Sequence, residues 1–308
     1  MTTTLSIIVV TYDSLSFIRD CVESIFVQTY KKFEIIVVDN NSQDKTVEFI
    51  KKNYPQIRLI ENGQNRGFPY ACNQGIEATR GKYILTLNSD VTLEEDFLYE
   101  IKRAMDEADP EVGLISPKIL WAKDKKLIDS TGLMLSRARR FFDRGRGEVD
   151  KSQYDREREI FGPCAAAALY KREMLKSVEV FNEYFDPDFF LLLEDFDLAW
   201  KAKNLGWKAL FVPEARCYHM RNISGRAIQY AQYLCFRNRY FLLVKNDNIR
   251  NLFKDIIFIL IYDILRLPYF LVINRYAVKA IRELKMKIPD MFKKRKMILL
   301  KKGFGNHK

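Results

Sequence analysis

The first half of the chain alternates short apolar runs with amphipathic stretches. Leu5–Thr11 is a nearly continuous apolar run, which is typical of a strand buried on both faces of a parallel sheet. Similar runs predict three further strands, at Phe33–Asp39, Ile57–Glu61 and Lys82–Leu87. Apolar residues at helical spacing predict helices at Ser14–Gln28, Thr46–Asn53, Pro69–Thr79 and Glu94–Glu107. This alternation predicts a doubly wound α/β fold, with a mostly parallel sheet and helices on both of its faces.

The second half begins with an irregular segment. Across Ser136–Arg158 the periodic pattern disappears, and the part from Arg137 to Gly147 is basic and contains glycine. Loops this long inside a domain are usually functional or disordered, so this one either closes over a bound ligand or is a solvated basic loop. Regular patterns return at Ile160–Tyr170, Asp186–Leu193, Glu194–Asn204 and Lys208–Val212. Long helical segments follow, so we expect an α/β domain over 1–225 and a helical C-terminal region over 226–308.

Positive charge is concentrated at the C-terminal end. The chain has a formal net charge of +11, and Arg275–Lys308 alone holds twelve Lys and Arg against two acids. Such a tail favours an anionic partner: phospholipid, nucleic acid or a phosphorylated substrate. The preceding stretch, Leu252–Ile273, is apolar but interrupted by charges, which disfavours a simple membrane-spanning helix.

Asp255, Asp263 and Arg266 fall on one side of this predicted helix and leave a broad apolar face. We therefore expect residues 250–308 to bind an anionic membrane surface peripherally. The alternative is a helix packed on the α/β domain, with a solvated basic end.

Composition narrows the class of protein. With 48% hydrophobic residues the chain can bury a large core, which excludes wholesale disorder. Its five cysteines form no C-x-x-C pair and suit a reducing compartment. The first ten residues lack the basic start and cleavage site of a signal peptide. We expect a cytoplasmic protein, attached to the cytoplasmic face of the membrane.

Polar residues follow the predicted strands. In an open α/β sheet, ligands bind beyond the carboxyl ends of the strands. These positions carry Thr11-Tyr12-Asp13, Asp39-Asn40-Asn41-Ser42, Asn65-Arg66-Gly67-Phe68 and Asn88-Ser89-Asp90. Amides, carboxylates and a glycine without a Ser–His or Cys–His pair suit a nucleotide diphosphate with a divalent cation, not hydride or acyl transfer. The Rossmann and P-loop glycine patterns are also absent, which argues against NAD and kinase chemistry.

Each of these segments also has a structural interpretation. Asp39 could begin a turn or cap the next helix, and Asn65 with Gly67 is an ordinary turn sequence. Asn88 and Asp90 point the same way on an extended segment and could share one ligand, with Asp90 binding Mg²⁺ or Mn²⁺.

A second acidic group, Glu194-Asp195-Phe-Asp197, follows an apolar run. Partial burial would raise the basicity of such a carboxylate and suit it to act as a general base. The alternative is that these acids only favour the helix macrodipole. His219 could bind the metal or the diphosphate, or could be structural.

Five ordered segments together resemble the GT-A glycosyltransferases of family 2, especially the bacterial rhamnosyltransferase-like branch. They are Ser6-Ile-Ile-Val-Val-Thr-Tyr, Val38-Asp39-Asn-Asn-Ser42, Asn65-Arg-Gly-Phe68 with Ala71-Cys-Asn73, Asn88-Ser-Asp90 and Glu194-Asp-Phe-Asp-Leu198. The resemblance covers about residues 4–225. It implies an inverting transferase that uses a nucleotide sugar and a divalent cation, Mg²⁺ or Mn²⁺.

The resemblance also implies roles for individual residues. The nucleoside would be held by Thr11, Tyr12 and Asp39, and the ribose and diphosphate by Asn65, Gly67 and Asn73. Asp90 stands at the last position of the D-x-D motif and would bind the metal. Asn88 replaces the first Asp, as in the rhamnosyltransferase-like branch.

On the acceptor side, the resemblance makes Asp195 the catalytic base, with Glu194 as the second choice. Phe161–Ala168 resembles an acceptor-side loop, although Ala165 stands where glycine is expected. His219 followed by Ser224 matches a late His-x-x-Ser element only loosely.

The resemblance favours dTDP-β-L-rhamnose as the donor, with a UDP-hexose as the alternative. The membrane expectation favours a lipid-linked or cell-surface saccharide as the acceptor. A nucleic-acid binder acting through the basic C-terminus is the alternative from another class, but it leaves the polar strand ends unexplained, so no nucleic acid is expected as a partner. The sequence is compatible with a homo-oligomer.

Overall fold

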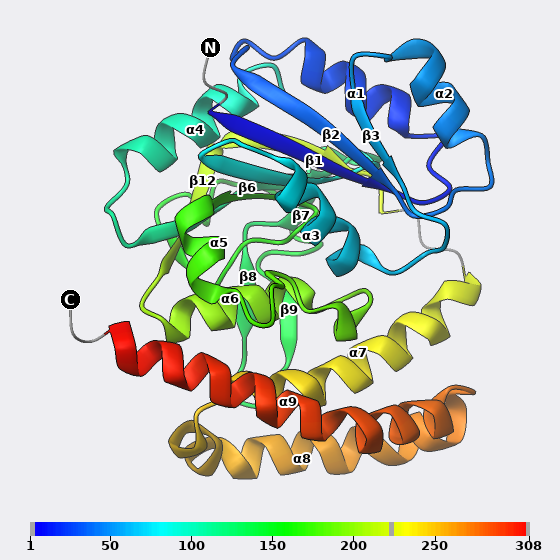
Figure 1. Cartoon of the computed structure of the whole chain (residues 1–308). Helices are drawn as coiled ribbons and strands as arrows, with labels where there is room; N and C mark the ends of the chain where they lie inside the picture. Colours follow the sequence, from blue (N-terminus) through cyan, green and yellow to red (C-terminus); the bar gives the residue numbers. More distant parts are fainter. Residues whose placement is uncertain (1–3, 222–224, 306–308) are drawn as a thin grey trace.

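The N-terminal half of the computed structural model, which describes residues 4–221 and 225–305, is built around four parallel strands. They lie in the order β4-β1-β2-β3 (Figure 1), with bounds β1 Leu5–Thr11, β2 Phe33–Asp39, β3 Arg58–Glu61 and β4 Tyr83–Asn88. The intervening helices are α1 Ile18–Phe26, α2 Thr46–Asn53, α3 Phe68–Ala78 and α4 Phe97–Glu107. The predicted alternation is therefore confirmed, with element ends displaced by a few residues.

The second half of the sheet is mixed. β11 (Ala167–Lys171) runs antiparallel to both β4 and β6 (Val112–Trp121), and β6 pairs in parallel with β12 (Lys208–His219). Three short strands pair at this side: β5 Val91–Leu93, β7 Ile128–Ser130 and β10 Glu159–Ile160. β12 was expected to end at Val212, but it continues past an irregularity between Val212 and Arg216 as far as His219. This extension places His219 beside Val91 of β5, next to Asp90 in the chain.

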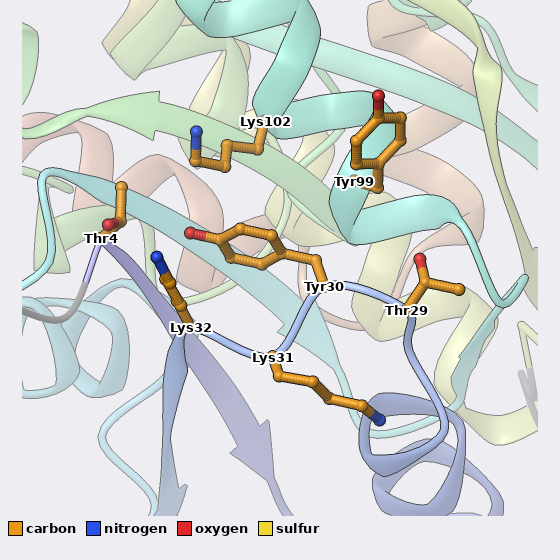
Figure 2. A pocket seen from close by; sticks show the side chains of 7 residues that line it. All are labelled: Thr4, Thr29, Tyr30, Lys31, Lys32, Tyr99 and Lys102. Carbon is orange, nitrogen blue, oxygen red and sulfur yellow. The ribbon is translucent and has the colours of Figure 1, made fainter. Parts of the chain in front are cut away.

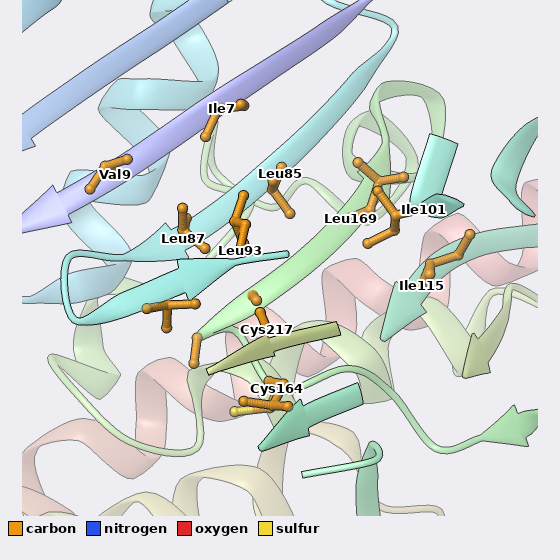
Figure 3. Packing of buried hydrophobic residues seen from close by; sticks show 14 of the residues in the cluster. Ile7, Val9, Leu85, Leu87, Leu93, Ile101, Ile115, Cys164, Leu169 and Cys217 are labelled. Carbon is orange, nitrogen blue, oxygen red and sulfur yellow. The ribbon is translucent and has the colours of Figure 1, made fainter. Parts of the chain in front are cut away.

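Both faces of the sheet are covered, as expected for strands of this composition. Ile7 and Val9 pack into one core with α1 and α4, whereas Ile8 between them packs into a second core with α3, α5 (Arg172–Val178) and α6 (Glu194–Asn204). Figure 3 shows the first core, where Ile7, Val9, Leu85 and Leu87 line up along neighbouring strands. Successive side chains of one strand therefore pack into two different cores, one on each face, so the sheet lies between two layers of helices.

The segment around Ser136–Arg158 contains local structure that the sequence did not show. β8 (Leu133–Leu135) and β9 (Phe141–Asp143) form a two-stranded hairpin that reaches toward the C-terminal helices (Figure 1). A short 3-10 turn, Pro187–Phe189, leads into α6. We call residues 133–147 the basic hairpin.

The C-terminal region consists of α7 (Gly225–Asn246), α8 (Ile249–Ile273) and α9 (Ala277–Gly305). It docks on the α/β domain through a buried ion cluster. Lys245 lies 2.6 Å from Asp186 and 2.9 Å from Asp197, and Lys294 lies 2.5 Å from Asp186. The basic tail is therefore only partly solvated, because Lys294 is buried in this interface.

α8 lies on the outer side of the molecule, away from β1–β3 (Figure 1). Its acids face inward: Asp255 pairs with Arg137 and Arg139, and Asp263 pairs with Arg239. Its outer face is apolar and exposed, for example at Phe253 (74%), Leu265 (73%) and Val272 (81%). Within the described residues, α8 is the helix that by length and composition could cross a membrane.

Candidate active site

Two connected cavities lie at the carboxyl ends of the parallel strands. The smaller, the strand-end cavity (about 350 Å³), is lined by residues 10–14 of β1 and its loop, by Asn65 and Gly67, and by Asn88 and Asp90. The larger, the carboxylate cavity (about 1040 Å³), is lined by Glu194, Asp195, His219 and the basic hairpin. Both cavities share Phe68, Asn88, Asp90 and Leu191. Segments far apart in the sequence therefore converge on one crevice.

Asp39 lies beneath this crevice and is absent from its lining. Its Oδ1 accepts hydrogen bonds from the hydroxyls of Thr11 (2.8 Å) and Ser42 (2.5 Å), and its Oδ2 accepts one from the Ser42 amide (2.9 Å). Asp39 thus connects the end of β1 with the turn that follows β2. This contact agrees with the structural interpretation of Asp39 as a residue that begins a turn. Thr11 and the half-exposed Tyr12 do line the cavity.

Gly67 is needed for a close backbone contact. It has φ +86°, and a Cβ at this position would lie 2.3 Å from the carbonyl oxygen of Phe190. The same oxygen accepts a hydrogen bond from the Phe68 amide (2.8 Å). The space where a side chain would stand is therefore filled by the segment before α6, while Gly67 itself still lines the strand-end cavity. Asn65 holds this turn by accepting the Gly67 amide (2.9 Å).

Asn73 does not line either cavity. Its side-chain carbonyl accepts the amides of Tyr184 (3.2 Å) and Phe185 (2.9 Å), and its amide donates to the Phe185 carbonyl (2.7 Å). Direct contact between Asn73 and ribose or diphosphate does not fit this placement.

Asp90 and His219 stand together where the cavities join. His219 Nε2 lies 3.3 Å from Asp90 Oδ1, and its Nδ1 lies 2.8 Å from Asp129 Oδ2. The row continues to Arg221, which lies 2.6 Å from Asp129 and 2.9 Å from Asp143. Asp129 and Arg221 fix the orientation of the imidazole, and no sequence motif had indicated Asp129.

The charged neighbours in this row shift the pKa values of Asp90 and His219. Burial by itself would raise the pKa of Asp90, but the hydrogen bond and charge of His219 outweigh it and hold the pKa below its usual value. Burial disfavours the protonated imidazole, yet Asp129 and Asp90 together raise the pKa of His219.

Of this pair, the carboxylate of Asp90 is the ligand that suits Mg²⁺ or Mn²⁺, and the imidazole of His219 could add one nitrogen when it is neutral. The described residues contain no group of three or more His, Cys, Asp or Glu side chains arranged around one point. A cation held by Asp90 and His219 would take its other ligands from diphosphate and water.

Asp195 is half-buried at the start of α6 and opens into the carboxylate cavity. Its oxygens accept the amides of Phe196 (2.8 Å) and Ala165 (3.4 Å). Burial, reinforced by the charge of Asp143, raises the pKa of Asp195 to about 7. A carboxylate with this basicity is suited to remove a proton near neutral pH.

Glu194 and Asp197 differ from Asp195 although they share its motif. Glu194 lines the cavity, but it is buried, its Oε2 has no hydrogen-bond partner among the described residues, and burial with the charge of Asp195 raises its pKa well above the usual range. Asp197 is fully buried and accepts hydrogen bonds from Lys245 (2.9 Å) and Asn246 (2.8 Å) of α7. Asp197 therefore anchors the C-terminal region, and Asp195, the less buried of the two acids that line the cavity, is the base candidate.

Residues 189–193, which precede Asp195, are held by α7. Asn238 is fully buried, and its amide donates to the carbonyls of Phe189 (3.0 Å), Leu191 (3.0 Å) and Leu192 (2.6 Å). No motif in the sequence of α7 indicates Asn238.

A further cavity, of about 410 Å³, lies at the opposite, amino-terminal ends of β1 and β2. Figure 2 shows its lining of Tyr30, Tyr99 and three lysines, with none of the carboxylates described above. It is separate from the crevice.

Comparison with known proteins agrees with this geometry. The profile of the family Glycosyl transferase family 2 matches residues 6–178. A glycosyltransferase of Methanococcus voltae, named dolichyl N-acetyl-alpha-D-glucosaminyl phosphate 3-beta-D-2,3-diacetamido-2,3-dideoxy-beta-D-glucuronosyltransferase, is 28% identical over 73% of this chain and 70% of its own length. The uncharacterized glycosyltransferase YibD of Escherichia coli K12 is 38% identical, over 29% of this chain and 26% of its own. Neither relative is named a rhamnosyltransferase.

Solved structures show the same fold. The mannosyltransferase PcManGT from Pyrobaculum calidifontis, in complex with GDP-Man and Mn²⁺, matches with a TM-score of 0.57 and 18% identity over 96% of this chain and 74% of its own. Residues 1–349 of Staphylococcus aureus TarS in complex with UDP match with a TM-score of 0.51 and 20% identity over 78% of this chain and 65% of the other.

Coverage of the sequence relatives is uneven. The match spans only 26% of YibD and 38% of the glycosyltransferase GlyG of Streptococcus pneumoniae. The family profile, by contrast, matches more than half of this chain, and the neighbouring structures share its GT-A architecture. This chain belongs to glycosyl transferase family 2.

Proposed function

We propose that this protein is an inverting, cation-dependent glycosyltransferase that moves a sugar from a nucleotide sugar to a saccharide acceptor. The observation that carries the proposal is the junction of the two cavities. Asp90 and His219 stand at the junction, and Asp195, a carboxylate of raised basicity, opens into the larger cavity.

The residues divide the work between the two cavities. Thr11, Tyr12 and Asn65 line the strand-end cavity and would seat the nucleotide, with its diphosphate directed toward Asp90. A cation bound by Asp90 and His219 would neutralise the charge that develops on the leaving diphosphate. Asp195 would accept the proton of the acceptor hydroxyl as that hydroxyl attacks the anomeric carbon from the opposite face. One displacement of this kind inverts the anomeric configuration.

For the donor we propose dTDP-β-L-rhamnose, with a UDP-hexose as the alternative. Asn88 before Asp90 supports the first, because this variant resembles the rhamnosyltransferase-like branch. The TarS complex with UDP and the PcManGT complex with GDP-Man show that neighbours with this fold bind other nucleotides. A binding screen of dTDP-, UDP- and GDP-sugars with Mg²⁺ or Mn²⁺ separates these donors.

The acceptor that we propose is a lipid-linked or cell-surface saccharide, presented at the cytoplasmic face of a membrane. The exposed apolar face of α8 and the adjoining basic helix α9 support peripheral attachment there. The Methanococcus voltae relative is named for a dolichyl-phosphate-linked sugar, which supports an acceptor of this class.

Vesicle binding tests the attachment. Wild-type protein should sediment with anionic vesicles in preference to neutral ones, and Ile264→Glu with Leu265→Glu should abolish this. Val27→Glu, at an exposed apolar residue far from α8 in the chain, is the matched control. Tighter binding to single- or double-stranded DNA than to anionic vesicles would contradict the membrane proposal.

Sugar transfer tests the catalytic proposal. Asp195→Asn should keep its affinity for the donor and lose transfer by a factor of about 10²–10⁴, the usual contribution of a general base. Asp90→Ala should lose the increase in donor affinity that Mg²⁺ or Mn²⁺ produces. Glu95→Gln, an exposed acid outside both cavities, is the control. Undiminished transfer by Asp195→Asn would remove the role given to that carboxylate.

A further inference from the structure

The basic hairpin contains five arginines, and three of them are committed to structural partners. Arg137 lies 2.8 Å from Asp255, and Arg139 lies 2.6 Å from Asp247. Arg144 is buried and donates to the hydroxyl and carbonyl of Thr131 and to the carbonyl of Glu157. These three hold the hairpin in place.

The other two, Arg140 and Arg146, form no ion pair with any carboxylate in the described part of the chain. Both are exposed, and both line the carboxylate cavity that contains Asp195. Four acids line that cavity. Asp143 pairs with Arg221 and Asp90 with His219, and neither Glu194 nor Asp195 forms an ion pair with Arg140 or Arg146 in the described part of the chain. Two uncompensated positive charges therefore face the cavity.

The diphosphate of the donor does not account for these arginines. In the proposed function it extends from the strand-end cavity toward Asp90, and neither Arg140 nor Arg146 lines that cavity. An anion bound by the two arginines would lie in the part of the crevice that holds the base, where the acceptor must enter.

The basic hairpin is also attached to α8. Arg137 stacks on the ring of Phe258 at 4.0 Å in addition to pairing with Asp255, and Arg239 of α7 donates to the carbonyl of Ala138 (2.9 Å). The hairpin that carries Arg140 and Arg146 thus lines the carboxylate cavity and also contacts the helix with the exposed apolar face.

We propose that Arg140 and Arg146 bind the phosphate or diphosphate that joins the acceptor sugar to a lipid. The sugar would extend to Asp195, and the hydrocarbon chain would lie along the apolar face of α8. This inference rests on the proposed function and adds to it a phosphate site. Guanidinium groups suit this ligand, because each can donate two hydrogen bonds to phosphate oxygens.

Ligand binding without sugar transfer tests the site. The probes are farnesyl diphosphate, farnesol and inorganic diphosphate, titrated by calorimetry in the presence of whichever of dTDP, UDP or GDP binds most tightly, so that the donor position is filled. Arg140→Gln with Arg146→Gln is compared with Lys151→Gln and Arg156→Gln. The latter pair removes the same charge from exposed positions outside the cavity.

Farnesyl diphosphate should bind wild-type protein more tightly than farnesol or inorganic diphosphate does. Its affinity should fall about tenfold for each arginine removed, and the control and the nucleotide affinity should not change. Equal binding of farnesyl diphosphate to the double variant, or none to wild type, overturns the site. If the double variant also loses affinity for the nucleotide, the arginines bind the donor and the proposed site is wrong. If inorganic diphosphate binds wild-type protein as tightly as farnesyl diphosphate does, the lipid chain contributes nothing and that part of the proposal is wrong. Failure of every donor to react would refute the proposed function and leave this result standing.

Discussion

Asn238→Ala should release the segment that carries the catalytic base, although Asn238 contacts no substrate. The segment is conformationally costly: Phe190, Leu192 and Leu193 all have φ between +62° and +69°. Left-handed backbone costs a residue with a side chain about 1–2 kcal/mol, so the three together cost about 3–6 kcal/mol. Hydrogen bonds from α7 offset that strain.

The size of the effect follows from which carbonyls are left without a donor. Phe189 keeps a hydrogen bond from Arg237 (2.8 Å), whereas the carbonyls of Leu191 and Leu192 lose the Asn238 amide. Each unsatisfied acceptor costs about 1–3 kcal/mol. The free energy of unfolding should therefore fall by about 3 kcal/mol, and a displaced segment should lower kcat/KM by about 100-fold.

Two measurements separate positioning from a general loss of stability. Urea unfolding gives the free energy, and kcat/KM is measured at a temperature where the variant is folded. Asn274→Ala is the matched control, because Asn274 is equally buried and donates to the backbone of Gln229 within the helical region. It should lose stability and keep its activity. Full activity in folded Asn238→Ala would refute the reasoning.

Three further outcomes follow from the structure. As the pH is lowered through about 7, kcat/KM should fall, because burial raises the pKa of Asp195 to about 7 and the protonated carboxyl cannot act as a base. A kcat/KM that stays unchanged down to pH 5 would contradict this role. Gly67→Ala should lower the free energy of unfolding by at least about 2 kcal/mol in denaturant titration, since its Cβ would meet the Phe190 carbonyl at 2.3 Å. A variant as stable as the wild type would show that the segment around Phe190 moves aside and would contradict this prediction. Asp186→Asn should cost about 3 kcal/mol by leaving Lys245 undercompensated. Because Lys245 and Lys294 hold the pKa of Asp186 below its usual value despite burial, wild-type stability should decline below pH of about 4 more steeply than that of this variant.

Much of the N-terminal fold could be predicted from the sequence. Buried parallel strands need apolar side chains on both faces, so β1 and β2 appear as continuous runs whose bounds were predicted correctly. The turns that follow them need amides, carboxylates and glycine, so the strand-end cavity could also be anticipated. These features depend on neighbouring residues, and a single sequence contains that information.

Other features depend on contacts between distant segments. Asp195, Glu194 and Asp197 are nearly equivalent in sequence, and only burial and partners decide that Asp195 faces the cavity while Asp197 binds Lys245.

The same limit applies to the glycine and to the histidine. The sequence shows a turn at Gly67, but only the fold brings the backbone of Phe190, more than a hundred residues away, against it. His219 gains its orientation from Asp129, which no motif marks. Periodicity and turn chemistry are local and can be read along the chain, whereas pairing, burial and pKa arise from contacts that exist only once the chain has folded.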